Sequence, residues 1–318
     1  MNLSSLIRSI VASAVLLPLA ACTGIRFGYN HADTWLTFRL DQYLDLEKEQ
    51  KKLAKSRIAT LLAWHRSTQL QDYSALLGEI RTKLKGPVTP SDVADFQRKI
   101  ERRLIALGER AAPEIARLAL TLGPDQIARV RRELDDDNER FRKKFGYSHN
   151  GAGNELADRA KLFIKRAEFW LGKLTEEQRA LIREAIARRE NGDYTWADER
   201  EARQLGFLAL LSKIQEKKPE ERVATSWIRD YFADLSGQAD PRRRAFVQSL
   251  RQSNAELIAK VIASATPEQR AVLDERLQGY AADLAALAEE ERKFGQRTFP
   301  LRPAEKPMEP ETTFRNTY

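Results

Sequence analysis

Residues 156–178, LADRAKLFIKRAEFWLGKLTEEQ, carry the two signals that decide the fold. Apolar side chains recur there every three or four residues, at Leu156, Ala160, Phe163, Ala167, Trp170 and Leu174. That spacing predicts one face of an amphipathic helix. Thr175 and Gln178 then have the spacing of a capping box, in which the threonine accepts from the amide of residue 178 and the glutamine reaches back to the cap. A second helix is therefore expected to begin directly after the first.

The same apolar spacing recurs in three other segments of the chain. Its positions are Leu70, Tyr73, Leu77, Ile80 and Leu84, then Val93, Phe96, Ile100, Leu104 and Leu107, and finally Leu273, Leu277, Tyr280, Leu284 and Leu287. Stripes this narrow are typical of long antiparallel helices that pack at shallow angles, and they favour a core over a cofactor groove. The sequence predicts an all-α fold of helical hairpins or a bundle, helical from about residue 33 to 294.

Turn signals divide this helical pattern. They are Gly86-Pro87, Gly123-Pro124, the loop 146–153, the turn 191–193, Lys218-Pro219, Asp240-Pro241 and Thr266-Pro267. Pro113 is expected to interrupt or kink a helix. We expect a helical N-terminal half at 31–145, a helical C-terminal half at 154–294, and an extended or disordered tail at 295–318, which holds four prolines.

One pattern recurs at predicted helix starts. Its copies are Leu122–Gln126, Leu174–Gln178, Ala265–Gln269 and, more loosely, Leu46–Gln50. Each has a glutamine four residues after an apolar residue, as a helix cap preceded by a hydrophobic staple would require. The irregular distance between copies favours pseudo-repeated helical hairpins over a regular solenoid.

The stretch Leu19-Ala20-Ala21-Cys22 is a lipobox and contains the only cysteine of the 318 residues. It follows Arg8 and an apolar segment at 10–19, which is shorter than the ~20 residues of a membrane-spanning helix. We expect a signal peptide at 1–21, an acylated Cys22 carrying fatty acids such as palmitate, and a lipidated linker at 22–30. The alternative is a plain secretory signal with an incidental cysteine. Thr23 favours sorting to the outer membrane, facing the periplasm.

Composition narrows the function further. The chain has 42% hydrophobic and 31% charged residues with a formal net charge of +8. An exported lipoprotein meets lipid head groups rather than nucleic acid, so no nucleic-acid partner is expected, and the scattered basic pairs are typical of solvated helix faces. Because no cysteine follows Cys22, the mature chain has no disulfide, thiol nucleophile or cysteine-ligated metal.

Two family resemblances follow from these motifs. Leu174-Thr175-Glu176-Glu177-Gln178 resembles the helix starts of the Spy and CpxP family, which implies an all-helical periplasmic protein of a group that includes chaperones and stress sensors. The chain also looks like an uncharacterised family of proteobacterial lipoproteins, a resemblance that implies a lipid-anchored helical protein and no known activity. It rests on Tyr29-Asn30, Trp35-Leu36, Asp41–Leu46 with Gln50, Trp64-His65-Arg66 and Asn138-Glu139-x-Phe141.

The most aromatic segment of the chain lies just after the lipobox. Tyr29, Trp35, Phe38 and Tyr43 are candidate contacts with a partner or with the bilayer surface, where tryptophan and tyrosine are enriched. The other interpretation is that this segment docks on the helical body as part of its core.

No catalytic or metal site is expected. His31, His65 and His149 lie in separate segments without metal-ligand spacing. His65 is interpreted as a half-buried, hydrogen-bonded histidine, with a ligand-contacting cluster as the alternative. Asp135-Asp136-Asp137 is interpreted as a solvated patch because consecutive helical residues diverge. We expect no cofactor.

The function expected from the sequence is that of a non-catalytic, lipid-anchored periplasmic protein that binds envelope protein clients or partners, in a chaperone-like manner or otherwise. One alternative is a structural or assembly lipoprotein that bridges the outer membrane and an envelope complex or the cell wall. Another is an enzyme acting on lipid or glycan, which would need a polar cleft where carboxylates or histidines converge.

Overall fold

A computed structural model describes residues 23–145, 155–188, 194–235, 237 and 239–298. Within these ranges all regular structure is α-helical, which confirms the predicted fold class. In chain order the helices are α2 (Thr23–Asn30), α3 (Ala32–Leu44), α4 (Lys48–Thr68), α5 (Leu70–Leu84), α6 (Pro90–Ala119), α7 (Pro124–Phe145), α8 (Glu155–Leu171), α9 (Glu176–Ala187), α10 (Trp196–Lys217), α11 (Glu221–Ala233), α12 (Pro241–Ala263) and α13 (Pro267–Thr298).

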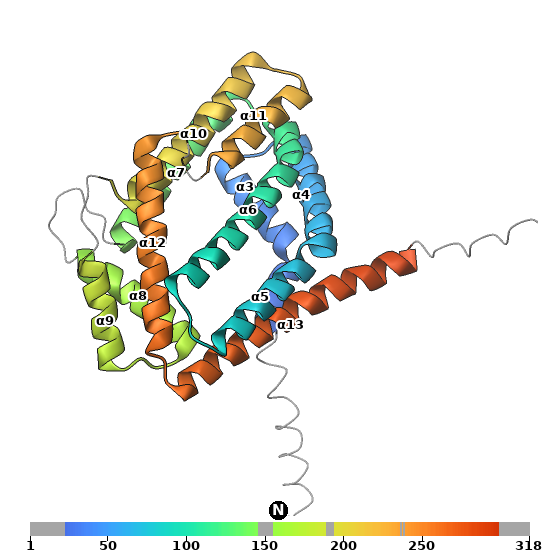
Figure 1. The fold of residues 1–318 in the computed structure, drawn as a ribbon. Helices are drawn as coiled ribbons and strands as arrows, with labels where there is room; N and C mark the ends of the chain where they lie inside the picture. Colours follow the sequence, from blue (N-terminus) through green and yellow to red (C-terminus); the bar gives the residue numbers. More distant parts are fainter. Residues whose placement is uncertain (1–22, 146–154, 189–193, 236, 238, 299–318) are drawn as a thin grey trace, which may run out of the picture.

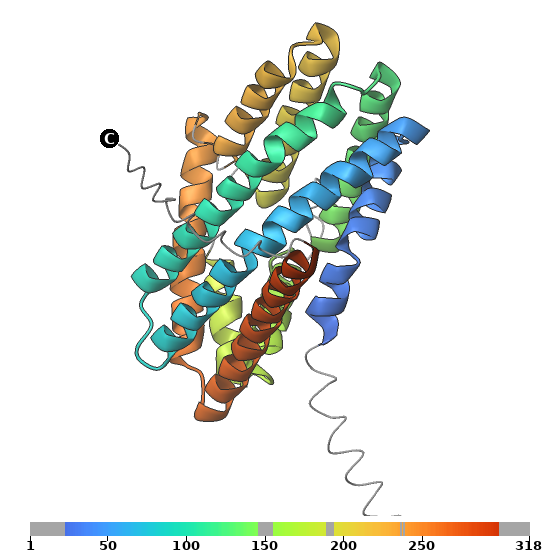
Figure 2. The same cartoon turned by 90° about the vertical axis from the view of Figure 1, so that its right-hand side faces the viewer.

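The helices surround two hydrophobic cores at opposite ends of an elongated body (Figures 1 and 2). The first core holds buried side chains of α3, α4, α6, α7, α10 and α11, among them Ala116, Ile214 and Ile228. The second core holds side chains of α8, α9, α12 and α13, such as Ile182 and Leu277, and α5 packs against it. The long helix α6 joins the two ends, because its first turn packs on α12 through Val93 while its last turns enter the first core.

The two halves of the sequence share these cores. Helix α5 runs along α13, α6 packs on α11 and α12, and α7 packs on α10. Each of these pairs joins the segment 31–145 to the segment 154–294. The first core therefore draws its buried residues from both predicted halves, whereas those of the second core come from 154–294 alone, with α5 of the first half packed against it.

The helix boundaries follow the local signals in most places. Thr89, Thr175, Thr195 and Asp240 each cap a helix with a side-chain oxygen that accepts from an amide of the first turn. Pro113 lies inside α6, so of the expected interruption or kink the interruption does not occur. The packing of α6 against α4, α11 and α12 holds the helix across this residue. The predicted loop at 146–153 and turn at 191–193 lie outside the described residues.

Both ends of the helical part differ from the expectation. The predicted linker is helical from Thr23, because α2 packs on α13 and Arg26 pairs with Glu290. At the other end α13 continues through residues 295–298, where a tail was predicted. Leu19, Ala20, Ala21, Cys22 and residues 299–318 lie outside the part that the structure describes.

The four helix-start motifs meet in pairs. Gln178 and Gln269 each accept from the amide of their own cap residue, at 3.0 Å, and each donates to the other's carboxamide oxygen, at 2.7 and 2.9 Å. Their remaining donors reach the carbonyls of Ser264 and Lys173, just before the partner's helix. Each glutamine thus caps one helix and fastens it to the start of another.

Gln50 and Gln126 repeat this arrangement in the first core. Their carboxamides exchange hydrogen bonds of 3.1 and 2.8 Å, and their other donors reach the carbonyls of Thr121 and Leu44. Each of the two cores therefore contains one glutamine pair that joins the starts of two helices.

Candidate functional site

Of the four aromatic residues proposed as a contact surface, two are exposed and two are partly buried. Trp35 and Phe38 are exposed, with 60% and 57% of their surface accessible, whereas Tyr29 and Tyr43 are partly buried against the body. Phe27, at 68%, is also exposed and was not among the predicted residues. Its position eight residues before Trp35 places it on the same helical face, and this spacing was the signal that could have identified it.

Tyr29 fastens α2 to α4. Its hydroxyl lies 2.8 Å from Nδ1 of His65, and the two rings stack. Next to this pair Arg66 donates to Oδ1 of Asn30 at 2.7 Å. Burial lowers the pKa of His65, so the neutral ring is favoured. The residues of the Tyr29-Asn30 and Trp64-His65-Arg66 motifs thus contact one another, and His65 is the hydrogen-bonded histidine that the sequence suggested.

Tyr43 fastens α3 to α7. Its hydroxyl donates to Asp137, which also accepts from Arg140. Burial opposes ionisation of Asp137, but these hydrogen bonds outweigh it and lower the pKa of the carboxyl. Asp135 and Asp136 are exposed, so the three carboxylates do not share a site. In the described segments no three residues of the types His, Cys, Asp and Glu converge as metal ligands would.

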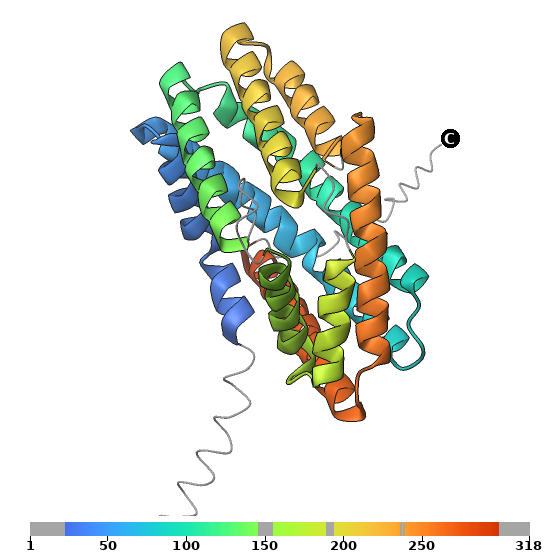
Figure 3. The ribbon, with the colours of Figure 1, turned by 90° about the vertical axis from the view of Figure 1, so that its left-hand side faces the viewer.

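The exposed residues on the outward side of α2 and α3 are formally uncharged, and Arg26 and Arg39, each with a side chain 42% accessible, lie at its margins. Its exposed residues are Gly24, Phe27, Gly28, Asn30, His31, Thr34, Trp35, Phe38 and Gln42. We call this side the aromatic face. The two helices join almost without a break at His31, whose amide bonds to Gly28 O and whose carbonyl accepts from the amide of Trp35. The face is therefore one continuous strip along the edge of the molecule, where the dark-blue helices run in Figures 2 and 3.

A second exposed apolar strip lies on α6. Ile100 and Leu104, one turn apart, are 46% and 56% accessible. Beside them Glu101 pairs with Arg251 of α12, and Arg103 donates to both carboxylate oxygens of Asp72 in α5. Because residues 101 and 103 lie on either side of Ile100 and Leu104 on a helix, α12 and α5 flank this α6 strip, which stays accessible between them. Figure 1 shows α6 between these two helices.

Two buried glutamates show how the chain uses its charges. Glu114 is surrounded by Arg57, Arg110 and Arg117, at 3.6, 3.0 and 2.9 Å. Burial raises the pKa of Glu114, but hydrogen bonds and charges of Arg110 and Arg117 dominate and lower it. A carboxylate held ionised in this way is a poor general acid. Its arrangement is that of an ion cluster between helices.

Glu199 is the second of these residues and is fully buried at the start of α10. It accepts from Arg203 at 2.7 Å, from two nitrogens of Arg243 at 3.0 Å and from the Tyr194 hydroxyl at 3.0 Å. Burial opposes its ionisation, yet these donors lower its pKa overall. Burial and the neighbouring carboxylate raise the pKa of Tyr194 to about 12. The cluster joins α10 to α12.

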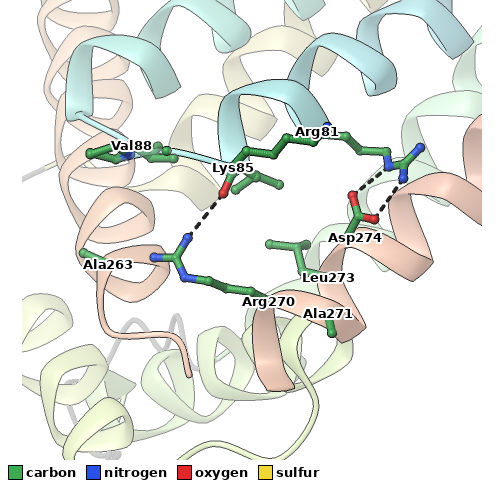
Figure 4. A pocket seen from close by; sticks show the side chains of 11 residues that line it. Arg81, Lys85, Val88, Ala263, Arg270, Ala271, Leu273 and Asp274 are labelled. Carbon is green, nitrogen blue, oxygen red and sulfur yellow. Dashed lines mark hydrogen bonds and ion pairs between the residues drawn. The ribbon is translucent and has the colours of Figure 1, made fainter. Parts of the chain in front are cut away.

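A shallow pocket of about 740 Å³ lies where α5, α12 and α13 meet (Figure 4). Arg81 on its wall binds Asp274 through two hydrogen bonds of 2.7 and 2.8 Å. Arg270 donates to the carbonyls of Leu84 and Ile262, near the C-terminal ends of α5 and α12. The two arginines thus bind an acid and helix-end carbonyls, so they join the ends of the three helices that meet at the pocket.

The predicted site residues thus fall into three groups. Tyr29, Tyr43 and His65 hold helices together, and Trp35 and Phe38 are exposed beside Phe27. Cys22, the lipobox residues and His149 lie outside the described ranges. Within those ranges no helix has the length and hydropathy needed to cross a bilayer.

Comparison with known families gives a match over more than half of the chain. A family model matches residues 42–231, which run from the end of α3 to α11. The chain belongs to DUF6279, a family of unknown function. The match confirms the expectation of an uncharacterised family and brings no activity to the protein. No curated protein and no solved structure gave a significant match to this DUF6279 member.

Proposed function

We propose that this DUF6279 protein is a non-catalytic lipoprotein of the proteobacterial envelope. Acyl chains on Cys22 anchor it to the outer membrane, and its helical body binds protein partners or clients in the periplasm. The lipobox at 19–22 supports the anchor and its position in the envelope.

The exposed α6 strip supports the binding role. Ile100 and Leu104 are large apolar side chains open to solvent on the helix that joins the two cores. Ion pairs to α5 and α12 flank them, so an apolar centre lies between charged margins. That pattern is typical of a protein interaction surface. The buried carboxylates Glu114 and Glu199 are bound by arginines, which agrees with a structural use of charge.

The chaperone-like form of this function can be tested with the full processed chain in lipid nanodiscs. We expect it to slow the aggregation of an unfolded model client, and Ile100→Ser with Leu104→Ser to abolish that effect. Arg102→Ser is the matched control, because residue 102 is exposed on the opposite side of α6. Equal suppression by all three proteins would remove the α6 strip from the proposal, and no suppression by the unmodified protein would remove the chaperone form.

A second candidate is an assembly role with one fixed partner. The narrow width of the α6 strip, bounded by Glu101–Arg251 and Arg103–Asp72, favours a single complementary surface over many clients. A photo-crosslinking residue at position 104, compared with one at 102, separates the two roles in intact membranes. One stoichiometric adduct specific to 104 favours assembly, and a broad range of adducts favours the chaperone.

A further inference from the structure

We infer that the aromatic face of α2 and α3 lies in the interfacial region of the bilayer that holds the lipid anchor. The large apolar side chains of this face are Phe27, Trp35 and Phe38. The inference rests on the anchor of the proposed function, and it adds a second contact and a fixed orientation of the body on the membrane.

Distance along the chain is the first argument. Helix α2 begins at Thr23, directly after the predicted acylated residue. At about 1.5 Å per residue, Phe27 lies only about 8 Å along the helix from Cys22, and Phe38 about 24 Å. A lipid on Cys22 therefore holds the first aromatic side chain at the membrane surface. All three aromatic residues reach the interface only if the helix axis lies along the surface rather than perpendicular to it.

The chemistry of the face is the second argument. Of the chain's residues 31% are charged, yet every exposed residue from 24 to 42 is formally uncharged. Burial of this strip in the interface therefore desolvates no ion within the strip, which would be costly, while Arg26 and Arg39, each with a side chain 42% accessible, lie at its margins. Tryptophan and phenylalanine on one side of a helix are typical of segments that lie in the bilayer interface.

Three of the charged residues beside the face pair with other helices of the body. Arg26 pairs with Glu290 of α13, and Asp41 pairs with Lys51 of α4 at 2.8 Å. Arg39 lies 3.9 Å from the Asp137 carboxylate of α7 and also donates to Gln42 of the face, and Asp33 lies at the edge of the face. The pairs that Arg26, Arg39 and Asp41 form with α13, α7 and α4 hold α2 and α3 in one rotation about their axes, so that the same side points outward.

A protein partner would be the other occupant of such a face. The α6 strip has ion pairs on both sides, which suits the polar rim of a protein interface. The aromatic face has an uncharged length of helix and a nearby acylation site instead. The bilayer therefore matches it better than a protein does.

The experiment uses the single cysteine of the chain. Because acylation consumes Cys22, a cysteine introduced elsewhere is the only free thiol of the processed full-length protein. Phe38→Cys carries an environment-sensitive fluorophore on the aromatic face. Ile258→Cys is the control, since Ile258 is 42% exposed on α12, which lies at the opposite edge of the molecule from α3 in Figures 2 and 3.

The labelled proteins are reconstituted in vesicles of phosphatidylethanolamine and phosphatidylglycerol that contain an acyl-chain nitroxide quencher. We expect a blue shift and lipid-dependent quenching at position 38, protection there from aqueous iodide, and the reverse at position 258. If position 38 responds as position 258 does, the inference is wrong. The same holds if position 38 is open to iodide in pure vesicles and protected only in native membranes, which would assign the face to a protein.

Mass spectrometry of the same samples distinguishes the two proposals. An unmodified Cys22 in the processed protein would overturn the anchor and this inference together. An acylated protein with an iodide-accessible position 38 would overturn only the membrane contact of the aromatic face.

Discussion

Gly108 is the residue where two helices approach most tightly among the described glycines. A Cβ on this buried position of α6 would lie 2.6 Å from Cγ and 2.9 Å from Cβ of Phe232 in α11. Because carbon atoms do not approach so closely, Gly108→Ala must move α6 and α11 apart or displace the ring. We expect it to lower the free energy of unfolding by about 1–3 kcal/mol in urea titrations.

Gly78→Ala is the matched control for this substitution. Gly78 lies within α5, and a Cβ there meets no atom within 4 Å. Alanine favours the helix over glycine, so we expect a gain of roughly 0.5–1 kcal/mol. A loss of stability of similar size in both variants would show that packing against Phe232 is not the cause.

Asp283 in α13 is a buried carboxyl whose pKa is raised by burial, with the charge of Arg26 acting in the opposite direction. The folded protein therefore holds this proton more tightly than the unfolded chain, whose pKa is near 3.8. The resulting stabilisation is complete below pH 3.8 and is lost as the pH rises through the folded-state pKa. We expect Asp283→Asn to be more stable than the unmodified protein at pH 7, with the advantage shrinking on acidification.

Asp274→Asn should show the opposite sign. Hydrogen bonds from Arg81 lower the pKa of Asp274, so its contribution to stability is present above pH 3.8 and is lost as the pH falls through the lower folded-state value. This variant should be less stable near neutral pH and approach the unmodified protein in acid. Parallel pH profiles for the two variants would contradict both assignments.

At the scale of elements, the paired glutamines should behave as coupled units. Gln178→Ala leaves Gln269 without one of its partners in a buried position, so we expect each single substitution to cost about 1–3 kcal/mol. The double variant Gln178→Ala with Gln269→Ala should cost less than the sum. Urea unfolding of the four proteins gives the coupling energy.

The glutamine pair of the first core, Gln50 and Gln126, supplies the control for this cycle. Gln126 binds Gln50 and shares no hydrogen-bond partner with Gln178. Gln126→Ala combined with Gln178→Ala should therefore be additive within about 0.5 kcal/mol. If the Gln126–Gln178 combination showed a coupling energy as large as the Gln178–Gln269 combination, the two glutamine pairs would not act separately.

The helix starts show which contacts between and within elements could be predicted from the sequence. Thr175 with Gln178 and Thr266 with Gln269 were predictable, because a capping box depends on residues three apart. The pairing of Gln178 with Gln269 was not, because it joins residues 91 positions apart and depends on how helices pack. The helical state of residues 23–30 was missed for the same reason, since that segment packs on α13 and bonds to α4 through Tyr29 and His65.

The candidate surface was predictable only in part. The position of aromatic residues after the lipobox identified the segment, and Trp35 and Phe38 proved exposed. Tyr29 and Tyr43 bind His65 and Asp137, which are distant in sequence, so the segment alone could not assign their side. Docking and exposure both occur on this segment, on different sides of the same helices.

At the scale of the molecule, the shared cores should make unfolding cooperative. Trp64 belongs to the first half and Trp170 to the second, and α5, α6 and α7 each pack on helices of the other half. We expect variants that retain only one of these tryptophans as a reporter to give coincident urea transitions by fluorescence. Separate midpoints would indicate two independently stable units.

The long packing of α5 against α13 also sets an order of events during synthesis. Ser74 donates to the carbonyl of Ala281, 207 residues later, and Arg81 binds Asp274 after a separation of 193. A chain made from its N-terminus therefore exposes the apolar side of α5 until almost all of the protein has been translated. Such distant closure slows folding and lengthens exposure to aggregation. This protein should depend on a holding factor while it is being made, even though each of its helices is locally well specified.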